Sequence, residues 1–190
     1  MNLKTLTQRI KRKMGSFAAE EVETDRIPSA VIIPIVEIDG EPYLMFMRKT
    51  EDGSPHSGQV SFPGGCKEKR DKTMLETALR EFEEETGISR ENLEIIASLE
   101  PVPTRSTPFI IYPFIGILKG TVNPKPDKKE VARIFFVPFE FLFKSHPFCY
   151  RNYTYRGLVF RTPLIEYDGE TIWGATARIL ELFFDKLKEP

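Results

Sequence analysis

Three glutamates near the end of one short, charged segment have the side-chain type and spacing that bind a metal ion. Glu81, Glu84 and Glu85 lie close enough in the sequence to share one side of a helix. Like charges at this spacing repel, and acidic groups near a helix C-terminus oppose the helix dipole. At about 4 Å, a pair of unit charges costs roughly 4 kcal/mol at an effective dielectric of 20. A divalent cation would reverse the sign of this interaction, and carboxylate oxygens suit Mg²⁺ or Mn²⁺.

The segment around these glutamates predicts a short helix with recognisable ends. Thr73 and Glu76 have the spacing of a capping box, so the helix is expected to begin there. Gly87 stands where a left-handed residue would end it. The same helical periodicity predicts that Glu76 and Glu83 point toward solvent. The apolar residues expected to form its buried stripe are Leu75, Ala78, Leu79 and Phe82.

An ordinary solvated acidic face is the alternative interpretation of this helix, because runs of charge usually lie on the surface. Two neighbouring features favour the metal site. Arg80 directly precedes Glu81. The pair Gly64–Gly65 lies upstream, where a backbone carbonyl can approach a metal without a side chain in the way.

The overall composition is that of a globular protein. The chain has 190 residues, of which 41% are hydrophobic and 29% charged, which suits one domain or one domain with an appended segment. The net charge of -1 offers no general attraction to nucleic acid. No apolar run reaches the length of a membrane span. Two cysteines, Cys66 and Cys149, form no disulfide framework, so we expect a reducing compartment and a cytoplasmic protein.

The first 17 residues are basic and have apolar side chains at helical spacing. One interpretation is a surface helix packed on the domain. The other is a membrane-surface or organelle-targeting segment, since no acidic residue occurs before Glu20. We therefore divide the chain into a basic helix and connector over 1–29 and a main domain over 30–190.

Strand and helix patterns alternate along the main domain. A buried strand is expected over 30–37, with an irregularity at Pro34, and Asp39–Gly40 predicts a hairpin turn into a second strand. A further hairpin is expected over 155–165, followed by the turn signal Asp168–Gly169, and a last helix begins at Trp173. Other strands are expected over 93–99, 109–118 and 133–137. Strands on both sides of helices indicate mixed α/β layers.

The glutamate segment resembles a Nudix box, with glycines first, then an Arg-Glu pair, then Glu-Glu and a final glycine. Asp71 stands where a glutamate is usual, and one extra residue precedes Arg80; both departures resemble the coenzyme A diphosphatase branch of the superfamily. HSGQVSFPGG over 56–65 and IWGATARIL over 172–180 also resemble that branch. The box residues that match are Arg80, Glu81, Phe82, Glu84, Glu85, Gly87 and Ile88.

The resemblance implies an α/β/α sandwich with a mixed sheet. It also implies metal-dependent hydrolysis of coenzyme A or its thioesters to 3′,5′-ADP and 4′-phosphopantetheine, or an acyl form of it. Its substrate would thus be a small nucleotide. By the same resemblance, Mg²⁺ or Mn²⁺ would be held by Glu81, Glu84, Glu85 and the Gly64 carbonyl, with Glu84 also serving catalysis. Arg80 would orient the carboxylates rather than meet the substrate.

Residues outside the box complete the expected site. Glu130 is the candidate general base, with a plain loop acid as the alternative, and Glu68 is a candidate outer metal ligand. Arg48 could contact a substrate phosphate or form a surface ion pair. Nucleotide contacts are expected around His56, Gly58 and Gln59, although His56 could simply order its loop.

Two other functions stay open at this point. A Nudix hydrolase could cleave a different nucleoside diphosphate derivative, such as ADP-ribose or a dinucleotide. A non-catalytic module could bind a nucleotide without cleaving it, although a pure binder has no need of so much repulsive acidic charge. The sequence leaves the choice between a monomer and a homodimer open.

Overall fold

Strand β1 (Ile27–Ile38) organises the sheet, because three other strands pair along it. The computed structural model describes residues 1–15, 21–51, 57–120, 123–155 and 157–189. Strand β1 runs parallel to β7 (Phe109–Leu118) and antiparallel to β2 (Glu41–Lys49) and β4 (Gly64–Cys66). The sheet is therefore mixed. Its other strands are β3 (Val60–Ser61), β5 (Leu93–Ser98), β6 (Val102–Pro103) and β8 (Val131–Pro138).

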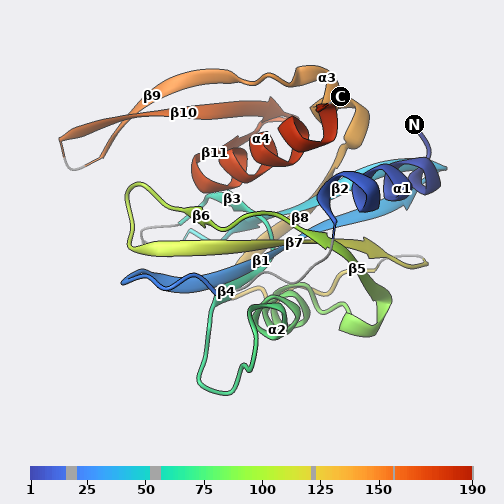
Figure 1. The fold of residues 1–190 in the computed structure, drawn as a ribbon, viewed down its shortest axis with the longest axis horizontal. Helices are drawn as coiled ribbons and strands as arrows, with labels where there is room; N and C mark the ends of the chain where they lie inside the picture. Colours follow the sequence, from blue (N-terminus) through green and yellow to red (C-terminus); the bar gives the residue numbers. More distant parts are fainter. Residues whose placement is uncertain (16–20, 52–56, 121–122, 156, 190) are drawn as a thin grey trace.

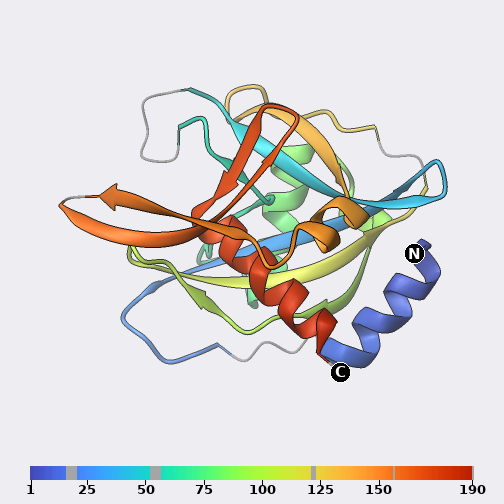
Figure 2. The same cartoon turned by 90° about the horizontal axis from the view of Figure 1, so that it is seen from above.

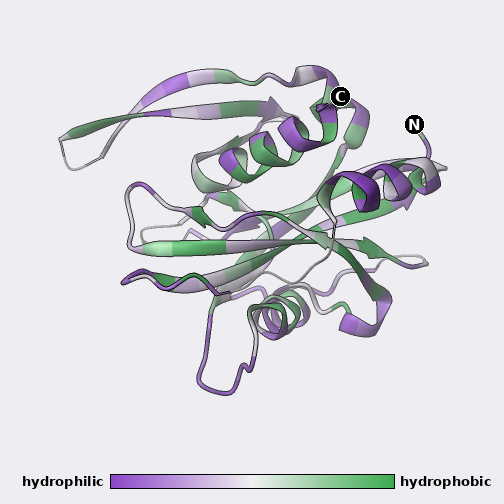
Figure 3. Cartoon of the chain, in the orientation of Figure 1, coloured by the Kyte–Doolittle hydropathy of each residue, from purple (hydrophilic) through white to green (hydrophobic). Residues whose placement is uncertain are grey.

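Helices cover both faces of this sheet (Figure 1). Helix α2 (Met74–Thr86) lies on one face, and the opposite face carries α1 (Leu3–Met14), α3 (Phe139–Ser145) and α4 (Gly174–Lys188). The sheet separates two groups of buried apolar side chains, and Figure 3 shows apolar residues along its strands. The expected α/β/α sandwich with a mixed sheet is confirmed. A short 3₁₀ turn, η1 (Arg90–Asn92), follows α2.

A second, three-stranded sheet consists of β9 (Cys149–Tyr155), β10 (Leu158–Tyr167) and β11 (Glu170–Trp173). The prediction of one hairpin over 155–165 was therefore wrong in extent: β9 begins six residues earlier, and Gly157 lies in a turn. The Asp168–Gly169 turn is confirmed, with positive φ at both residues, and it joins β10 to β11. Figure 1 shows the long β9–β10 hairpin extending from α4 beyond the central sheet.

The irregularity expected at Pro34 does not occur. The register between β1 and β7 runs without a shift from Ile27 to Ile35. On its other side, β1 pairs with β4 through Val31 and with β2 from Ile35, so Pro34 lies between the two ladders. A proline is tolerated there because its missing N–H falls where the partner strand changes.

Helix α1 packs on the body of the protein. Leu6 and Ile10 are fully buried in the core on that face of the sheet. Arg9 donates hydrogen bonds of 3.1 and 2.8 Å to the Leu187 carbonyl at the end of α4, and Lys11 forms a 3.1 Å ion pair with Glu94. Figure 2 shows α1 beside the end of α4. This arrangement agrees with the packed-helix interpretation, because the apolar face that a membrane would need is already covered. No helix in the described residues has the length and apolar character of a membrane span.

Helix α2 begins and ends as its sequence predicts. The Thr73 hydroxyl accepts a 3.1 Å hydrogen bond from the Glu76 amide, and Gly87 ends the helix in the left-handed region at φ 66°. The buried stripe differs slightly from the prediction. Ala78 and Phe82 are fully buried, whereas Leu75 and Leu79 are only partly buried.

A buried ion pair holds the preceding loop on α2. The Arg80 guanidinium donates to both carboxylate oxygens of Asp71, from Nε at 3.1 Å and Nη2 at 2.9 Å. The Thr77 hydroxyl and the Glu68 amide donate to the same carboxylate at 3.0 and 2.9 Å. These bonds, above all those from Arg80, hold the pKa of Asp71 well below its usual value. Because Asp71 and Arg80 are both buried, each is the main compensation for the other's charge.

The substitution Asp71→Asn tests this attachment. It leaves the buried Arg80 without its main counter-charge, so we expect the free energy of unfolding at pH 7 to fall by about 3 kcal/mol. The lowered pKa means that the pair stabilises the folded state above the usual carboxyl pKa, and that this contribution is lost progressively as the pH falls. Denaturant unfolding measured between about pH 7 and pH 2 should show the difference from wild type narrowing at the acid end.

A suitable control is Glu83→Gln on the same helix. Glu83 pairs with Arg90 at 2.9 Å, but both side chains are more than one-third exposed. Such a pair contributes less than about 1 kcal/mol. Equal losses in the two variants, or a loss at Asp71 that does not change with pH, would contradict the assigned role of the buried pair.

Candidate active site

Glu85 lies buried where α2 meets the glycine strand β4. Its side chain is 3% exposed, and its Oε2 accepts a 2.8 Å hydrogen bond from the Gly64 amide. Lys49 lies at the end of β2, and its ammonium group is 3.5 Å from Oε1 of Glu85. Burial raises the pKa of Glu85 to about 7, although Lys49 and the Gly64 amide oppose the shift. One lysine and one amide therefore leave the negative charge of this carboxylate incompletely compensated.

The two glycines of β4 permit this close packing. A Cβ atom on Gly64 would lie 2.2 Å from the Ala30 carbonyl oxygen of β1, and a Cβ atom on Gly65 would lie 2.5 to 2.7 Å from the Glu81 carboxylate. Any side chain at either position would displace backbone or carboxylate. Gly64 also has a φ of 155°. Gly64 thus lets β4 lie close against β1, and Gly65 lets the Glu81 carboxylate approach the backbone of β4.

Arg80 connects the other two glutamates. Its Nη1 donates to Glu81 at 2.7 Å and to Glu84 at 3.1 Å, while Nη2 donates to the Cys66 carbonyl at 3.1 Å. Burial raises the pKa of Glu81; Arg80 opposes this shift, and the charges of Glu84 and Glu130 add to it. Arg80 therefore touches both carboxylates and the loop at once.

Glu84 and Glu68 lie at the exposed edge of this group. Arg70 contacts Glu84 at 3.1 Å and Glu68 at 2.8 Å, and Glu68 also approaches Arg80 at 3.6 Å. Each of these contacts places a cation beside a carboxylate that was expected to serve the metal. The carboxylates are therefore held by arginine and lysine side chains in this structure.

Carboxylate oxygens are the chemistry that Mg²⁺ and Mn²⁺ prefer, so the donor set fits such an ion. The raised pKa values of Glu81 and Glu85 agree, because they show that the charged forms lack full compensation. However, among the described residues no three acidic, histidine or cysteine side chains converge into a ready-formed metal cluster. A bound ion would share these carboxylates with Arg80, which contacts one oxygen of Glu81 and one of Glu84.

The remaining predicted residues have different positions. Glu130 is exposed in the turn before β8, and its charge raises the pKa of both Glu81 and Glu85, so it lies near the acidic group. Arg48 forms ion pairs with the exposed Glu51 at 2.9 Å and with the buried Glu170 at 3.9 Å, so its guanidinium is already engaged by protein carboxylates.

The loop residues before the glycines are described only in part. His56 lies outside the described residues. The Gly58 amide donates to the Thr50 carbonyl at 3.1 Å, so this glycine shapes its own turn. Gln59 lines the large cleft that begins at the glycine strand.

Lys49 is a functional candidate that the sequence analysis did not single out. A register shift between Arg48 and Lys49 in the pairing of β2 with β8 marks a β-bulge there. Bulges often redirect side chains beside active sites. In a strand with one buried face, alternating apolar and polar residues would have indicated on which face Lys49 lies. The preceding run from Leu44 to Met47 is apolar and buried on both faces, so the sequence shows no such alternation.

A cleft of about 1120 Å³ begins at these residues. Its lining includes Lys49, Gly64 and Gly65, residues of the β9–β10 hairpin, and residues along α4. The cleft joins two segments that are far apart in the sequence. The Thr176 hydroxyl of α4 donates a 3.1 Å hydrogen bond to the Val60 carbonyl of β3.

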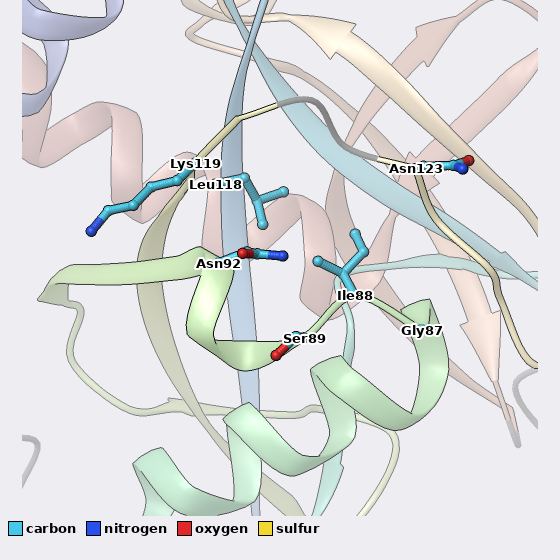
Figure 4. A pocket seen from close by; sticks show the side chains of 7 residues that line it. All are labelled: Gly87, Ile88, Ser89, Asn92, Leu118, Lys119 and Asn123. Carbon is cyan, nitrogen blue, oxygen red and sulfur yellow. The ribbon is translucent and has the colours of Figure 1, made fainter.

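A smaller pocket of about 190 Å³ lies at the C-terminal end of α2 (Figure 4). No acidic side chain is among the described residues that line it. Its lining residues are Gly87, Ile88, Ser89, Asn92, Leu118, Lys119 and Asn123. The larger cleft, which reaches the glycine strand and Lys49, is therefore the candidate active site.

Comparison with known proteins identifies the family. The NUDIX domain family matches residues 25–156. The chain is 33% identical over 152 residues to a Photorhabdus laumondii protein named uncharacterized Nudix hydrolase NudL, covering 80% of each chain. A Yersinia enterocolitica protein of the same name is 32% identical over 166 residues, covering 87% of this chain and 82% of its own.

Solved structures share the fold. A MutT/nudix family protein from Enterococcus faecalis has a TM-score of 0.55 at 14% identity, covering 98% of this chain and 70% of its own. An Ap4A hydrolase from C. elegans has a TM-score of 0.52 at 16% identity, covering 65% of this chain and 88% of its own. From the matched domain, the relatives and the glutamate helix together, the chain belongs to the Nudix family and is a Nudix pyrophosphohydrolase.

Proposed function

We propose that this enzyme hydrolyses the diphosphate bond of coenzyme A or acyl-coenzyme A. The products would be 3′,5′-ADP and 4′-phosphopantetheine or its acyl form. One observation carries the proposal: the two segments that resemble the coenzyme A diphosphatase branch line the same cleft. Residues 59–62 and 64–65 form part of one wall, and 173–176, 178 and 179 form part of another. The hydrogen bond from Thr176 to Val60 ties them together.

The acidic group of α2 would provide the metal site. A diphosphate resists attack because its negative oxygens repel a nucleophile. A bound Mg²⁺ or Mn²⁺ would offset that charge and lower the pKa of a bound water. The candidate ligands are Glu81, Glu84, Glu85 and the Gly64 carbonyl. Gly64 lines the cleft, Glu85 and Glu81 lie against the glycine strand, and Arg80 contacts both Glu81 and Glu84.

The surrounding residues would orient these groups and handle the proton. Arg80 contacts Glu81 and Glu84 while Asp71 fixes its guanidinium, so its proposed task is to position carboxylates. Glu130 is the candidate general base, because it is exposed to water and close enough to influence Glu81 and Glu85. Lys49 lines the cleft and offers a positive charge to a phosphate oxygen.

The main alternative is another nucleoside diphosphate derivative. One structural neighbour is a Shewanella oneidensis NUDIX domain, of the protein NrtR, complexed with ADP ribose, with a TM-score of 0.51 at 14% identity. Structural similarity at 14% sequence identity shows a shared fold and does not identify the substrate, which has to be measured. A nucleotide-binding module without catalysis is the remaining alternative.

A substrate panel tests the proposal directly. We expect coenzyme A and acetyl-coenzyme A to be cleaved in the presence of Mg²⁺ or Mn²⁺, with 3′,5′-ADP released from both. The panel should include ADP-ribose and a dinucleotide, and products should be separated chromatographically. Inert coenzyme A alongside cleaved ADP-ribose would make the alternative substrate class correct. No cleavage of any diphosphate would favour the binding module.

The substitution Glu85→Gln tests the metal assignment. We expect turnover at saturating Mg²⁺ to fall by orders of magnitude, because a metal ligand loses its charge. The metal-free protein should stay folded, since the change also removes an incompletely compensated buried charge. Mg²⁺ should raise the melting temperature of wild type and have little effect on the variant.

Glu83→Gln is the matched control on the same helix, because Glu83 pairs with Arg90 away from the acidic group. It should keep wild-type turnover and the Mg²⁺-dependent rise in melting temperature. Near-normal turnover of Glu85→Gln at saturating Mg²⁺ would show that the ligand assignment is wrong.

A further inference from the structure

Of the four arginines that line the same cleft in the described chain, three share one property: Arg26, Arg105 and Arg161. We call them the arginine cluster. They come from three separate segments: the start of the sheet, the loop between β6 and β7, and the projecting strand β10. Within the described chain, none of the three has a carboxylate at ion-pair distance; their recorded partners are carbonyl oxygens and one aromatic ring.

Hydrogen bonds hold the cluster around the β6–β7 loop. Arg26 Nη1 donates to the carbonyls of Thr104 and Phe109 at 3.0 and 3.3 Å. Arg105 Nη1 donates to the Arg161 carbonyl at 2.9 Å, which joins the loop to the β9–β10 hairpin. The Arg161 guanidinium lies 4.9 Å from the centre of the Tyr150 ring. These contacts orient the guanidinium groups but use only a minority of their N–H donors.

Other cations of the cleft are already compensated. Arg178 pairs with Glu181 at 2.6 Å, and Lys186 pairs with Glu100 at 2.6 Å. Lys49 approaches Glu85 at 3.5 Å. The arginine cluster thus stands out as positive charge that faces the cleft without acidic partners in the described chain. Like charges gathered in this way repel unless an anion lies between them.

We propose that the arginine cluster binds a phosphate monoester of the substrate, separate from the diphosphate that is cleaved. Guanidinium groups recognise phosphate through paired, charge-assisted hydrogen bonds, and a phosphate monoester offers three acceptor oxygens. This inference rests on the proposed function, under which the phosphate is the one on the 3′ carbon of the coenzyme A ribose. The cleft is lined by the cluster and also by Lys49, Gly64 and Gly65, which lie against Glu85 and Glu81, so a single molecule could extend from one to the other.

The cluster would make the 3′-phosphate a specificity determinant. ADP-ribose and most dinucleotides lack this group, whereas coenzyme A and its thioesters all carry it. The 3′-phosphate would compensate the positive charge of the arginine cluster, and a ligand without a 3′-phosphate would leave that charge uncompensated. The residues of the cluster would therefore separate coenzyme A from other nucleoside diphosphate derivatives without contacting the scissile bond.

Equilibrium binding of two products tests the cluster without relying on catalysis. Isothermal titration should show 3′,5′-ADP binding at least about tenfold more tightly than 5′-AMP, since the two differ only in the 3′-phosphate. Arg105→Gln and Arg161→Gln should each weaken 3′,5′-ADP roughly tenfold or more while changing 5′-AMP by less than about twofold. Added salt should reduce the difference in affinity between 3′,5′-ADP and 5′-AMP.

Arg151→Gln is the matched control. Arg151 is an exposed arginine of β9 in the same small sheet, pairs with Glu166 at 3.5 Å, and does not line the cleft. Both ligands should bind this variant as they bind wild type. Equal affinity of wild type for the two ligands, or equal weakening of both by the cluster variants, would overturn the proposal.

Cleavage assays separate this inference from the proposed function. The kcat/KM for coenzyme A should exceed that for dephospho-coenzyme A, which lacks only the 3′-phosphate, and the cluster variants should remove the difference. If both compounds are cleaved equally by wild type, the cluster inference fails and the proposed function stands. If neither is cleaved while 3′,5′-ADP binding still depends on Arg105 and Arg161, the phosphate site stands and the proposed function fails.

Discussion

The site depends on how the buried guanidinium of Arg80 is shared between Asp71 and two glutamates. Asp71 takes two of its hydrogen bonds and fixes its orientation, while the other end of the group reaches Glu81 and Glu84. Without a fixed cation, several carboxylates on one side of a helix would repel one another and favour local unfolding. The ion pair therefore holds the acidic helix and its preceding loop in one arrangement.

The acidic group is electrostatically unfavourable by itself. Burial raises the pKa of Glu81 and Glu85, and the Glu130 charge adds to both shifts. Arginine and lysine side chains now contact these carboxylates, so a metal ion would compete with them for the same oxygens. Sites that favour a charged ligand commonly have such incomplete compensation in the protein alone. The unfavourable free energy of the acidic group is offset by the rest of the fold, where the sheet buries apolar side chains on both faces.

The large cleft depends on elements that the central sheet does not provide. Strands β9 to β11 form a separate sheet, and the first turn of α4 follows it directly. Together with the loop between β6 and β7 they form one wall of the cleft. The family match ends at residue 156, so much of this wall lies beyond the matched domain. Variation in such appended segments is a direct way to change the substrate of a common hydrolytic core.

Local patterns in the sequence determined the helix of the acidic group, with its caps at Thr73 and Gly87. They also determined the hairpin at Asp39–Gly40 and the strand Phe109–Leu118, because turn chemistry and apolar runs act over a few residues. The spacing of the glutamates and the flanking motifs was sufficient to identify the superfamily. These features need no knowledge of distant contacts.

Only the tertiary structure decided which distant residues meet. It brought Lys49 to Glu85, a contact that the buried apolar run of β2 conceals, and it paired Arg48 with the exposed Glu51 and the buried Glu170. It also brought Arg26, Arg105 and Arg161 to the same cleft, although they are scattered over more than 130 residues. Periodicity reports which face of an element a side chain occupies, whereas strand order and register decide what lies opposite.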